Sequence, residues 1–214
     1  MKDLYSKISK VINNKKTLLG VGPMSLNVVD SSIDLADKFK TPIMLIASRR
    51  QIESEKYGGG YVNNWSTRKF SNYVKKKRKT SNIYLARDHG GPWQNNIDVE
   101  KKVSLKQAML SAKNSFEEDI DNDFSFIHID TSVDIHKKIN FKNSMDRLYE
   151  LYEHCYSYSR RKKKDILFEI GTEEQNGSTN SFDELHETLN CLSTFCQKNR
   201  LPRVTFVVIQ SGTR

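Results

Sequence analysis

The sequence predicts an α/β fold built on a parallel sheet, and two observations carry that prediction. Six short apolar runs follow one another at intervals of roughly 25 to 42 residues, which leaves room for a helix between successive strands. Each run is almost continuously apolar rather than alternating, as in parallel strands that are covered on both faces. The six predicted strands are Thr17–Val21, Pro42–Ala47, Ile83–Ala86, Phe124–Ile129, Ile166–Ile170 and Val204–Ile209.

The segments between these strands carry the 3.6-residue period of amphipathic helices. The clearest stripe precedes the sixth strand, and Ser181 stands before it as an N-cap with Glu184 at the third helical position. We expect the stripe to face the core; it consists of Phe182, Leu185, Leu189, Leu192 and Phe195. No low-complexity linker divides the chain, so we expect one barrel domain over residues 1–214.

Composition indicates a globular protein, with 36% hydrophobic and 29% charged residues in 214. No run approaches the ~18 apolar residues that a membrane span needs, and the first six residues lack the form of a signal peptide. We therefore expect a cytoplasmic protein without a membrane partner. The three cysteines show no C-x-x-C spacing, which predicts reduced thiols.

The net charge of +9 comes mainly from two basic runs, Lys75–Lys79 and Arg160–Lys164. Each run shortly precedes a predicted strand, at the end of a helix, where cations favour the helix dipole and solvate a loop. Both runs are expected on the face opposite the strand tips. No motif of stacking aromatic residues accompanies them, so nucleic acid is not an expected partner.

Two layouts fit six strands alternating with helices: an open doubly wound sheet, or part of an eight-stranded barrel. The first strand is followed by Gly22-Pro23-Met24-Ser25 rather than by a glycine-rich nucleotide-binding motif, which counts against the doubly wound folds that bind nucleotides. Polar residues stand at the tips of several strands, as in barrel enzymes. The sequence therefore favours a TIM (β/α)₈-type barrel, of which about six units are present.

The most polar strand tip is Asp88-His89, followed at once by Gly90-Gly91-Pro92. Carboxylates and a neutral imidazole can hold a divalent cation, and glycines let main-chain N–H groups approach a phosphate. His128 and Asp130 are two residues apart on one strand and should face the same way. The other candidate residues at the tips and the loops after them are Ser48, Gly59, Gly60, Ser132, Glu173, Gln210 and Arg214.

Taken in order, these tips resemble a known family, the non-catalytic subunit of class II D-tagatose-bisphosphate aldolase. The resemblance spans roughly residues 18 to 214. Its motifs are Asp88-His89-Gly90-Gly91-Pro92, Ile127-His128-Ile129-Asp130-Thr131-Ser132, Ile170-Gly171-Thr172-Glu173 and Val208-Ile209-Gln210-Ser211-Gly212. The segment Pro42–Ser48, followed by Gly58-Gly59-Gly60-Tyr61 and a capped helix at Ser66-Thr67, is also similar to the family.

The resemblance implies a TIM barrel of carbohydrate metabolism, related to the metal-dependent class II aldolases that act on ketose (bis)phosphates. It implies that Asp88 transfers a proton, that His89 binds zinc, and that Glu173 faces the same site as a second catalytic residue. The expected substrate-binding residues are Ser48, Gly59, Gly60, Asp130, Ser132, Gln210 and Arg214.

Two departures from the catalytic aldolases leave the activity open. The sixth tip offers Gln210 where those enzymes supply a further histidine ligand, and one histidine with carboxylates makes a weak zinc site. With six units ending at Arg214, we also expect a barrel that is incomplete, as part of a longer protein or completed by another chain. The chain is thus either an aldolase-like lyase or a non-catalytic partner that stabilises a catalytic aldolase subunit, and a homo-oligomer is a further possibility.

Overall fold

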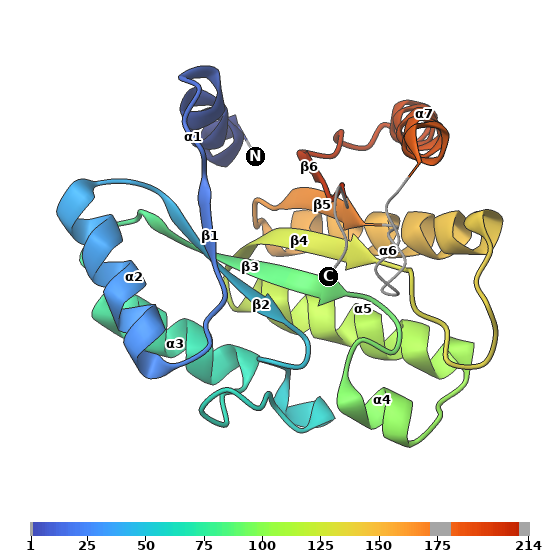
Figure 1. Ribbon diagram of the computed structural model, residues 1–214, viewed down its shortest axis with the longest axis horizontal. Helices are drawn as coiled ribbons and strands as arrows, with labels where there is room; N and C mark the ends of the chain where they lie inside the picture. The colour runs from blue at the N-terminus through green and yellow to red at the C-terminus, as the bar shows by residue number, and fades with distance from the viewer. Residues whose placement is uncertain (1, 172–180, 210–214) are drawn as a thin grey trace.

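The computed structural model describes residues 2–171 and 181–209. Its centre is a six-stranded sheet whose neighbouring strands are all parallel and follow one another in chain order (Figure 1). The strands are β1 (Leu19–Val21), β2 (Ile43–Ser48), β3 (Ile83–Gly90), β4 (Phe124–Asp130), β5 (Leu167–Gly171) and β6 (Phe206–Val207). All six predicted strands are confirmed, with β1 and β6 shorter and β3 longer than expected.

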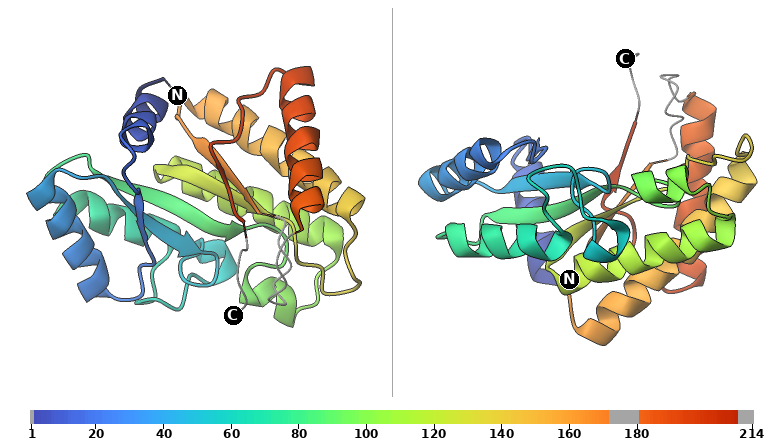
Figure 2. Two further views of the ribbon diagram at one scale, coloured as in Figure 1. Left: turned by 45° about the horizontal axis from the view of Figure 1, so that its top comes forward. Right: turned by 90° about the horizontal axis from the view of Figure 1, so that it is seen from below.

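The strand order decides between the two layouts. A doubly wound sheet reverses its strand order at a switch point, whereas the six strands described here run from β1 to β6 without a reversal. The sheet also curls (Figure 2). The fold is therefore α/β with a curled, half-barrel sheet, which is consistent with an incomplete TIM-type barrel.

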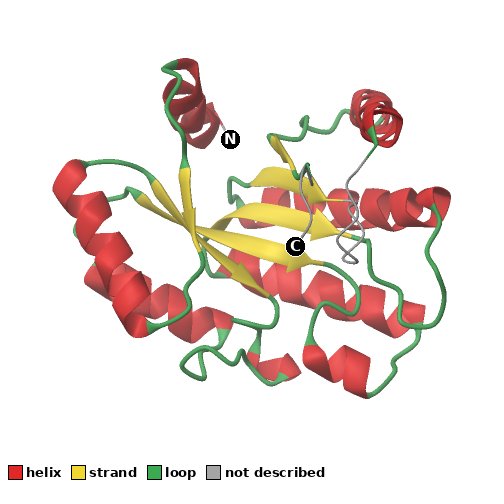
Figure 3. Ribbon diagram, viewed as in Figure 1, coloured by secondary structure: helices red, strands yellow, loops and turns green. Residues whose placement is uncertain are grey.

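The helices lie on both sides of this sheet, most of them on one (Figure 3). In chain order the helical segments are α1 (Lys2–Asn13), α2 (Leu26–Phe39), the 3₁₀ turn η1 (Glu55–Tyr57), α3 (Thr67–Lys77), α4 (Asn96–Glu100), α5 (Leu105–Asp121), α6 (Phe141–Lys162) and α7 (Phe182–Lys198). The main apolar core lies between the sheet and α2, α3, α5 and α6. We call the opposite side of the sheet its inner face.

Local sequence fixes where the helices begin. The side chain of Ser25 caps α2 and that of Ser66 caps α3, each by accepting a main-chain N–H three residues on. The predicted cap of α7 is confirmed as a full capping box, in which Ser181 and Glu184 bond to each other's main-chain N–H.

The inner face is built in two rows of side chains. One row is apolar and runs across four strands in register through Ile46, Ala86, Phe126 and Leu167. Ile8 of α1 is fully buried against this row. Because side chains alternate between faces, the next inward positions toward the carboxyl ends of β2 to β5 form a second row, which is polar: Ser48, Asp88, His128 and Glu169.

The stripe on α7 faces the core over only part of its length. Leu192 is buried, and the ring of Phe195 stacks on Tyr149 of α6 at 4.1 Å between centroids. Phe182, however, is 80% exposed and Leu189 is 39% exposed. The expectation that the whole stripe is buried is therefore wrong, because periodicity gives the apolar face of a helix and not how much of it a neighbour covers.

The two basic runs meet at the end of the sheet opposite the strand tips. Lys75, in the last turn of α3, pairs with Asp123 at 2.7 Å, and Lys164, just beyond α6, pairs with the same carboxylate. Asp123 immediately precedes β4, so this contact lies at the amino end of that strand. Among the described residues, no helix is both long and apolar enough to cross a membrane.

Candidate functional site

The end of β3 carries a β-bulge that places two consecutive side chains in the site. Arg87 pairs with Ile127 and Gly90 with Ile129, so three steps along β3 oppose two steps along β4. The extra residue lets His89 adopt a left-handed main chain, with φ of 42°. In a regular strand His89 would face away from Asp88. The bulge turns it toward β4, a role that bulges often have beside functional sites.

The two glycines of this turn allow a close approach between main chains. A Cβ atom on Gly90 would lie 2.6 Å from the carbonyl oxygen of His128, and one on Gly91 would lie 1.8 Å from that of Asp130. Any side chain at these positions would push the turn away from β4. The glycines are therefore needed to pack the turn, whatever further part their N–H groups play in binding a ligand.

Two histidine–aspartate pairs cross between β3 and β4. Nδ1 of His89 lies 2.7 Å from Oδ2 of Asp130. Nδ1 of His128 lies 3.2 Å from Oδ1 of Asp88 and also 3.3 Å from the main-chain nitrogen of His89. The two imidazole rings are 5.6 Å apart between centroids. Each carboxylate thus orients the imidazole of the other strand.

The two carboxylates differ in how far a ligand can reach them. Asp130 is buried and accepts hydrogen bonds from the side chain of Gln94 at 2.7 Å and from the main chain and hydroxyl of Ser132. Its side chain is therefore saturated and serves to hold its neighbours. The side chain of Asp88 is 32% exposed, so it can contact a substrate.

The surroundings of the site shift the pKa values of its carboxyl groups in opposite directions. Burial acts to raise the pKa of Asp88, but the hydrogen bond from His128 and the charges of both histidines outweigh it, and the pKa falls below its usual value. The pKa of Asp130 falls for the same kind of reason, with His89 as its main partner. Burial raises the pKa of Glu169, and the charge of Asp88 acts in the same direction against those of the two histidines.

His128 interacts electrostatically with all three carboxyl groups. Burial acts to lower its pKa, yet the hydrogen bond to Asp88 and the charges of Asp130 and Glu169 raise it above the usual histidine value. Glu169 is its direct register partner on β5. The site is therefore one electrostatic unit built from three neighbouring strands.

The structure brings four of the predicted residues together, namely Asp88, His89, Asp130 and Ser132, and it adds three that were not among the predicted site residues. His128 and Glu169 lie within apolar strands, and Gln94 lies in the loop after β3. A signal for the first existed in the sequence, because His128 precedes Asp130 by two residues on one strand. Glu169 likewise precedes Gly171, the last residue of β5, by two residues.

The remaining predicted residues are not shown to take part in the site. Ser48 is in register with Asp88, but its hydroxyl and N–H both bond to Gln51. The N–H groups of Gly59 and Gly60 donate to the carbonyls of Ser54 and Trp65 in the loop after β2. Both N–H groups are thus engaged within the loop, and the role of these glycines in binding stays a prediction. Glu173, Gln210 and Arg214 lie outside the described residues.

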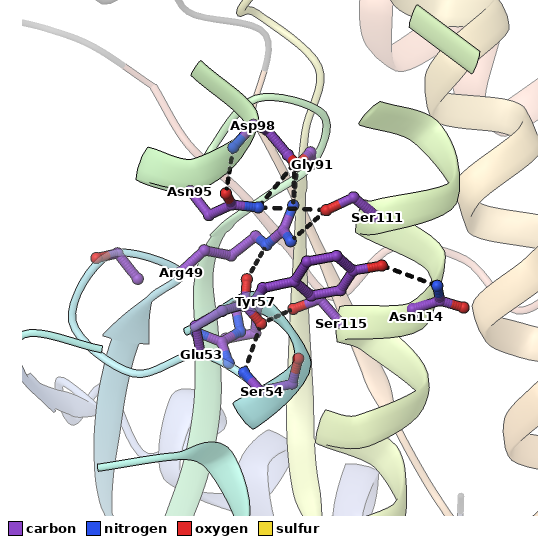
Figure 4. Close-up of polar contacts among 12 residues, drawn as sticks. Arg49, Glu53, Ser54, Tyr57, Gly91, Asn95, Asp98, Ser111, Asn114 and Ser115 are labelled. Carbon is purple, nitrogen blue, oxygen red and sulfur yellow. Dashed lines mark hydrogen bonds and ion pairs between the residues drawn. The ribbon is translucent and has the colours of Figure 1, made fainter. Parts of the chain in front are cut away.

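A buried polar network supports the bulge from the outer side (Figure 4). The guanidinium of Arg49 donates to the carbonyl of Gly91 at 2.7 Å, to Glu53 at 2.5 Å and to Ser111 of α5 at 2.9 Å. Arg49 is only 1% exposed and Glu53 is fully buried. The network joins the end of β2 and the turn after β3 to α5, so it holds the turn that carries His89.

The described residues do not form an evident zinc site. They include no group of three or more His, Cys, Asp or Glu side chains arranged to hold a metal ion. Nδ1 of His89 instead faces the Asp130 carboxylate, and Nδ1 of His128 faces that of Asp88. This is an arrangement of hydrogen-bonded pairs rather than of ligands converging on one point. Zinc at His89 therefore stays a prediction.

Comparison with known proteins gives a shared fold without a family. No protein-family model matches the sequence, and no curated protein matches it. Among solved structures, one described as a probable tagatose 6 phosphate kinase from Sinorhizobium meliloti 1021 superposes with a TM-score of 0.75 over 92% of this chain. The two proteins share a fold. At 19% identity the likeness extends no further, and this chain spans about half of the other, 50% of its length.

A second solved structure, an oxaloacetate acetylhydrolase, covers 90% of this chain and 59% of its own at 12% identity. Its TM-score of 0.49 is too low to support an argument. The comparisons thus agree with the α/β architecture, and the chemistry has to be argued from the side chains of the site.

Proposed function

We propose that the protein performs aldolase-like proton-transfer chemistry on a ketose (bis)phosphate. The observation that supports this most is the opposed tuning of two carboxyl groups on the inner face. The lowered pKa of Asp88 keeps a partly exposed carboxylate ionised, as a base requires. The raised pKa of Glu169 favours a protonated carboxyl, as an acid requires. Neighbouring groups with pKa values pushed apart are a common basis for acid–base catalysis.

The aldol cleavage then follows from these roles. Asp88 takes the proton from the substrate hydroxyl, the adjacent carbon–carbon bond breaks, and its electron pair moves toward the carbonyl oxygen. Glu169 gives its proton to that oxygen, so that an aldehyde and an enediol result. Asp88 then gives the proton it took to the enediol carbon while Glu169 takes the oxygen-bound proton back, which forms dihydroxyacetone phosphate and restores both carboxyl groups. His128 orients Asp88, and Asp130 orients His89. General acid–base catalysis of this kind accelerates a reaction by about 10²–10⁴-fold.

The substrate class rests on weaker support, which comes from the family resemblance of the strand tips. The described site is rich in groups that bind hydroxyls and carbonyls, as a ketose requires. Phosphate binding by Gly59, Gly60 and Arg214, hydroxyl binding by Ser48, Ser132 and Gln210, and a catalytic role for Glu173 remain part of the proposal.

The test is cleavage of D-tagatose bisphosphate by the purified chain, followed through the dihydroxyacetone phosphate released. We expect cleavage to fall by about 10²–10⁴-fold in Asp88→Asn. Asp146→Asn, which changes an aspartate paired with Lys142 on the exposed surface of α6, is the matched control and should keep full activity. Parallel reactions with a chelator and with added zinc test the zinc prediction. Cleavage unaffected by Asp88→Asn would refute the assignment.

One observation favours a second function, that of a non-catalytic subunit that stabilises a class II aldolase. The resemblance assigns zinc to His89, yet the described residues include no group of three or more His, Cys, Asp or Glu side chains arranged to hold a metal ion. If this function is correct, co-expression with a catalytic class II aldolase subunit should yield a stable complex and raise the melting temperature of that subunit. A chain that neither binds the subunit nor alters its melting temperature would exclude this function.

A further inference from the structure

One nitrogen atom in the site is buried and has no partner. Nε2 of His128 makes no hydrogen bond with any of the described residues, and the side chain is 1% exposed. Three other buried side-chain atoms share this property. Two belong to the hydroxyls of Ser54 and Thr67, and the third, Nε2 of His154, lies 3.0 Å from a carboxylate oxygen of Glu117. A buried imidazole nitrogen with neither a hydrogen bond nor a carboxylate within ion-pair distance is thus peculiar to His128 within the described part of the chain.

The surroundings of this nitrogen combine polar and apolar side chains. Asp88 and the main chain of His89 occupy the Nδ1 side of the ring, so Nε2 lies on the opposite side. Glu169 is the register partner of His128 on β5. Two residues earlier on these strands, Phe126 and Leu167 form the apolar row beneath. Ile8 of α1 covers this row, so a polar group bound beside Nε2 would lie next to it, toward the carboxyl ends of the strands.

The contacts at Nδ1 decide which chemical group fits at Nε2. Nδ1 meets an acceptor, the Asp88 carboxylate, and a donor, the N–H of His89. A neutral imidazole can satisfy one of them in each tautomer, and Nε2 is then an acceptor or a donor respectively, whereas the protonated ring that the raised pKa of His128 favours donates from Nε2. A carbonyl only accepts and an ammonium only donates, whereas a hydroxyl does both and fits either tautomer. A phosphate would be repelled by the ionised carboxylates of Asp88 and Asp130.

We infer that Nε2 of His128 binds the hydroxyl next to the substrate carbonyl, while the carboxyl of Glu169 meets the carbonyl oxygen. This rests on the proposed function and names the part of the substrate that lies deepest. The α-hydroxy ketone would lie beside Nε2 between β4 and β5, next to the apolar row that Ile8 covers, and the phosphate would lie toward the outer ends of the strands. Because of His128, tight binding would then depend on this hydroxyl of the substrate.

The experiment compares two ligands that differ in this hydroxyl: dihydroxyacetone phosphate, and acetol phosphate, in which a hydrogen replaces the hydroxyl and leaves a methyl group beside the carbonyl. Binding to the full chain is measured by calorimetry. We expect dihydroxyacetone phosphate to bind about 10- to 100-fold more tightly, as the loss of one partner from a buried polar group predicts. The His128→Phe variant should bind the two ligands about equally tightly. A merely structural role of His128 would weaken both ligands equally and leave the ratio intact.

His154→Phe is the matched control, because it alters a half-buried histidine on α6 and should keep the wild-type ratio. Nitrogen-15 spectra of the histidines give a second readout, in which dihydroxyacetone phosphate should shift the Nε2 signal of His128. Equal binding of the two ligands, or an Nε2 signal that responds only to water, would overturn the inference. If the protein prefers dihydroxyacetone phosphate over acetol phosphate but does not cleave the bisphosphate, the proposed function fails and the binding inference stands. If it cleaves the bisphosphate but binds the two ligands equally, the proposed function stands and the binding inference fails.

Discussion

The buried ion pair behind the bulge gives the sharpest prediction for stability. Arg49→Met removes the guanidinium that neutralises Glu53 and holds the carbonyl of Gly91, while it keeps most of the apolar volume. Glu53 is fully buried and is left with hydrogen bonds from the hydroxyl of Ser115 and the N–H of Ser54. An uncompensated buried charge is the main consequence of the substitution.

Breaking a buried pair by removing one partner costs about 3–5 kcal/mol. Because Glu53 keeps two hydrogen bonds, we expect the lower end of this range, about 3 kcal/mol. Replacing both partners, in Arg49→Met with Glu53→Leu, removes the stranded charge, and we expect the double variant to be more stable than the single one by at least ~1 kcal/mol.

The assay is urea unfolding of the wild type, both single variants and the double variant, followed by circular dichroism with shared slopes. The interaction energy comes from the double-mutant cycle. A single variant within ~1 kcal/mol of the wild type, or a double variant that loses the full sum of the two single losses, would refute the idea that burial of an unpaired charge dominates.

Three further predictions use the same unfolding assay. Gly91→Ala should destabilise the protein by about 1–3 kcal/mol, because the added Cβ would lie 1.8 Å from a carbonyl oxygen. In the control Gly22→Ala the nearest atom to the added Cβ is 3.7 Å away, so stability should change by less than ~0.5 kcal/mol. Equal losses in the two variants would contradict this. Glu169 has a raised pKa in the folded protein, so its contribution is present below its unfolded value near 4.5 and is lost as pH rises through the folded value. The stability of the wild type relative to Glu169→Gln should therefore fall as pH rises over that window, and a constant difference would exclude the shift. Phe182→Ser should cost less than ~0.5 kcal/mol and Leu192→Ala about 2–5 kcal/mol, since the first is 80% and the second 2% exposed; a large loss at Phe182 would mean that a neighbour covers it.

The sheet could be predicted because its strands are buried on both faces, which leaves an apolar run in the sequence. By the same criterion the third strand is predicted to end at Ala86, four residues before the observed end of β3. Arg87 continues the strand and is fully buried, since Asp119 of α5 neutralises it at 2.6 Å. That partner is 32 residues away in the sequence, so no local pattern indicates it.

The candidate site was predictable in part for a geometric reason. Parallel strands end at the same edge of a sheet, so Asp88 and Asp130 had to lie near each other. The bulge that turns His89 inward depends on the register between β3 and β4, which the sequence alone does not specify. His128 and Glu169 were not selected because the strands that carry them look apolar.

The measurement that tests the central claim most directly is hydrogen exchange at carbon in dihydroxyacetone phosphate, followed by proton NMR in deuterated water. Formation of the enediol by the acid and base of the inner face would replace a carbon-bound proton by deuterium. The account predicts exchange with the wild type and with Asp146→Asn, and a rate lower by about 10²–10⁴-fold in Asp88→Asn. An absence of exchange in the wild type, or exchange that Asp88→Asn leaves unchanged, would contradict it.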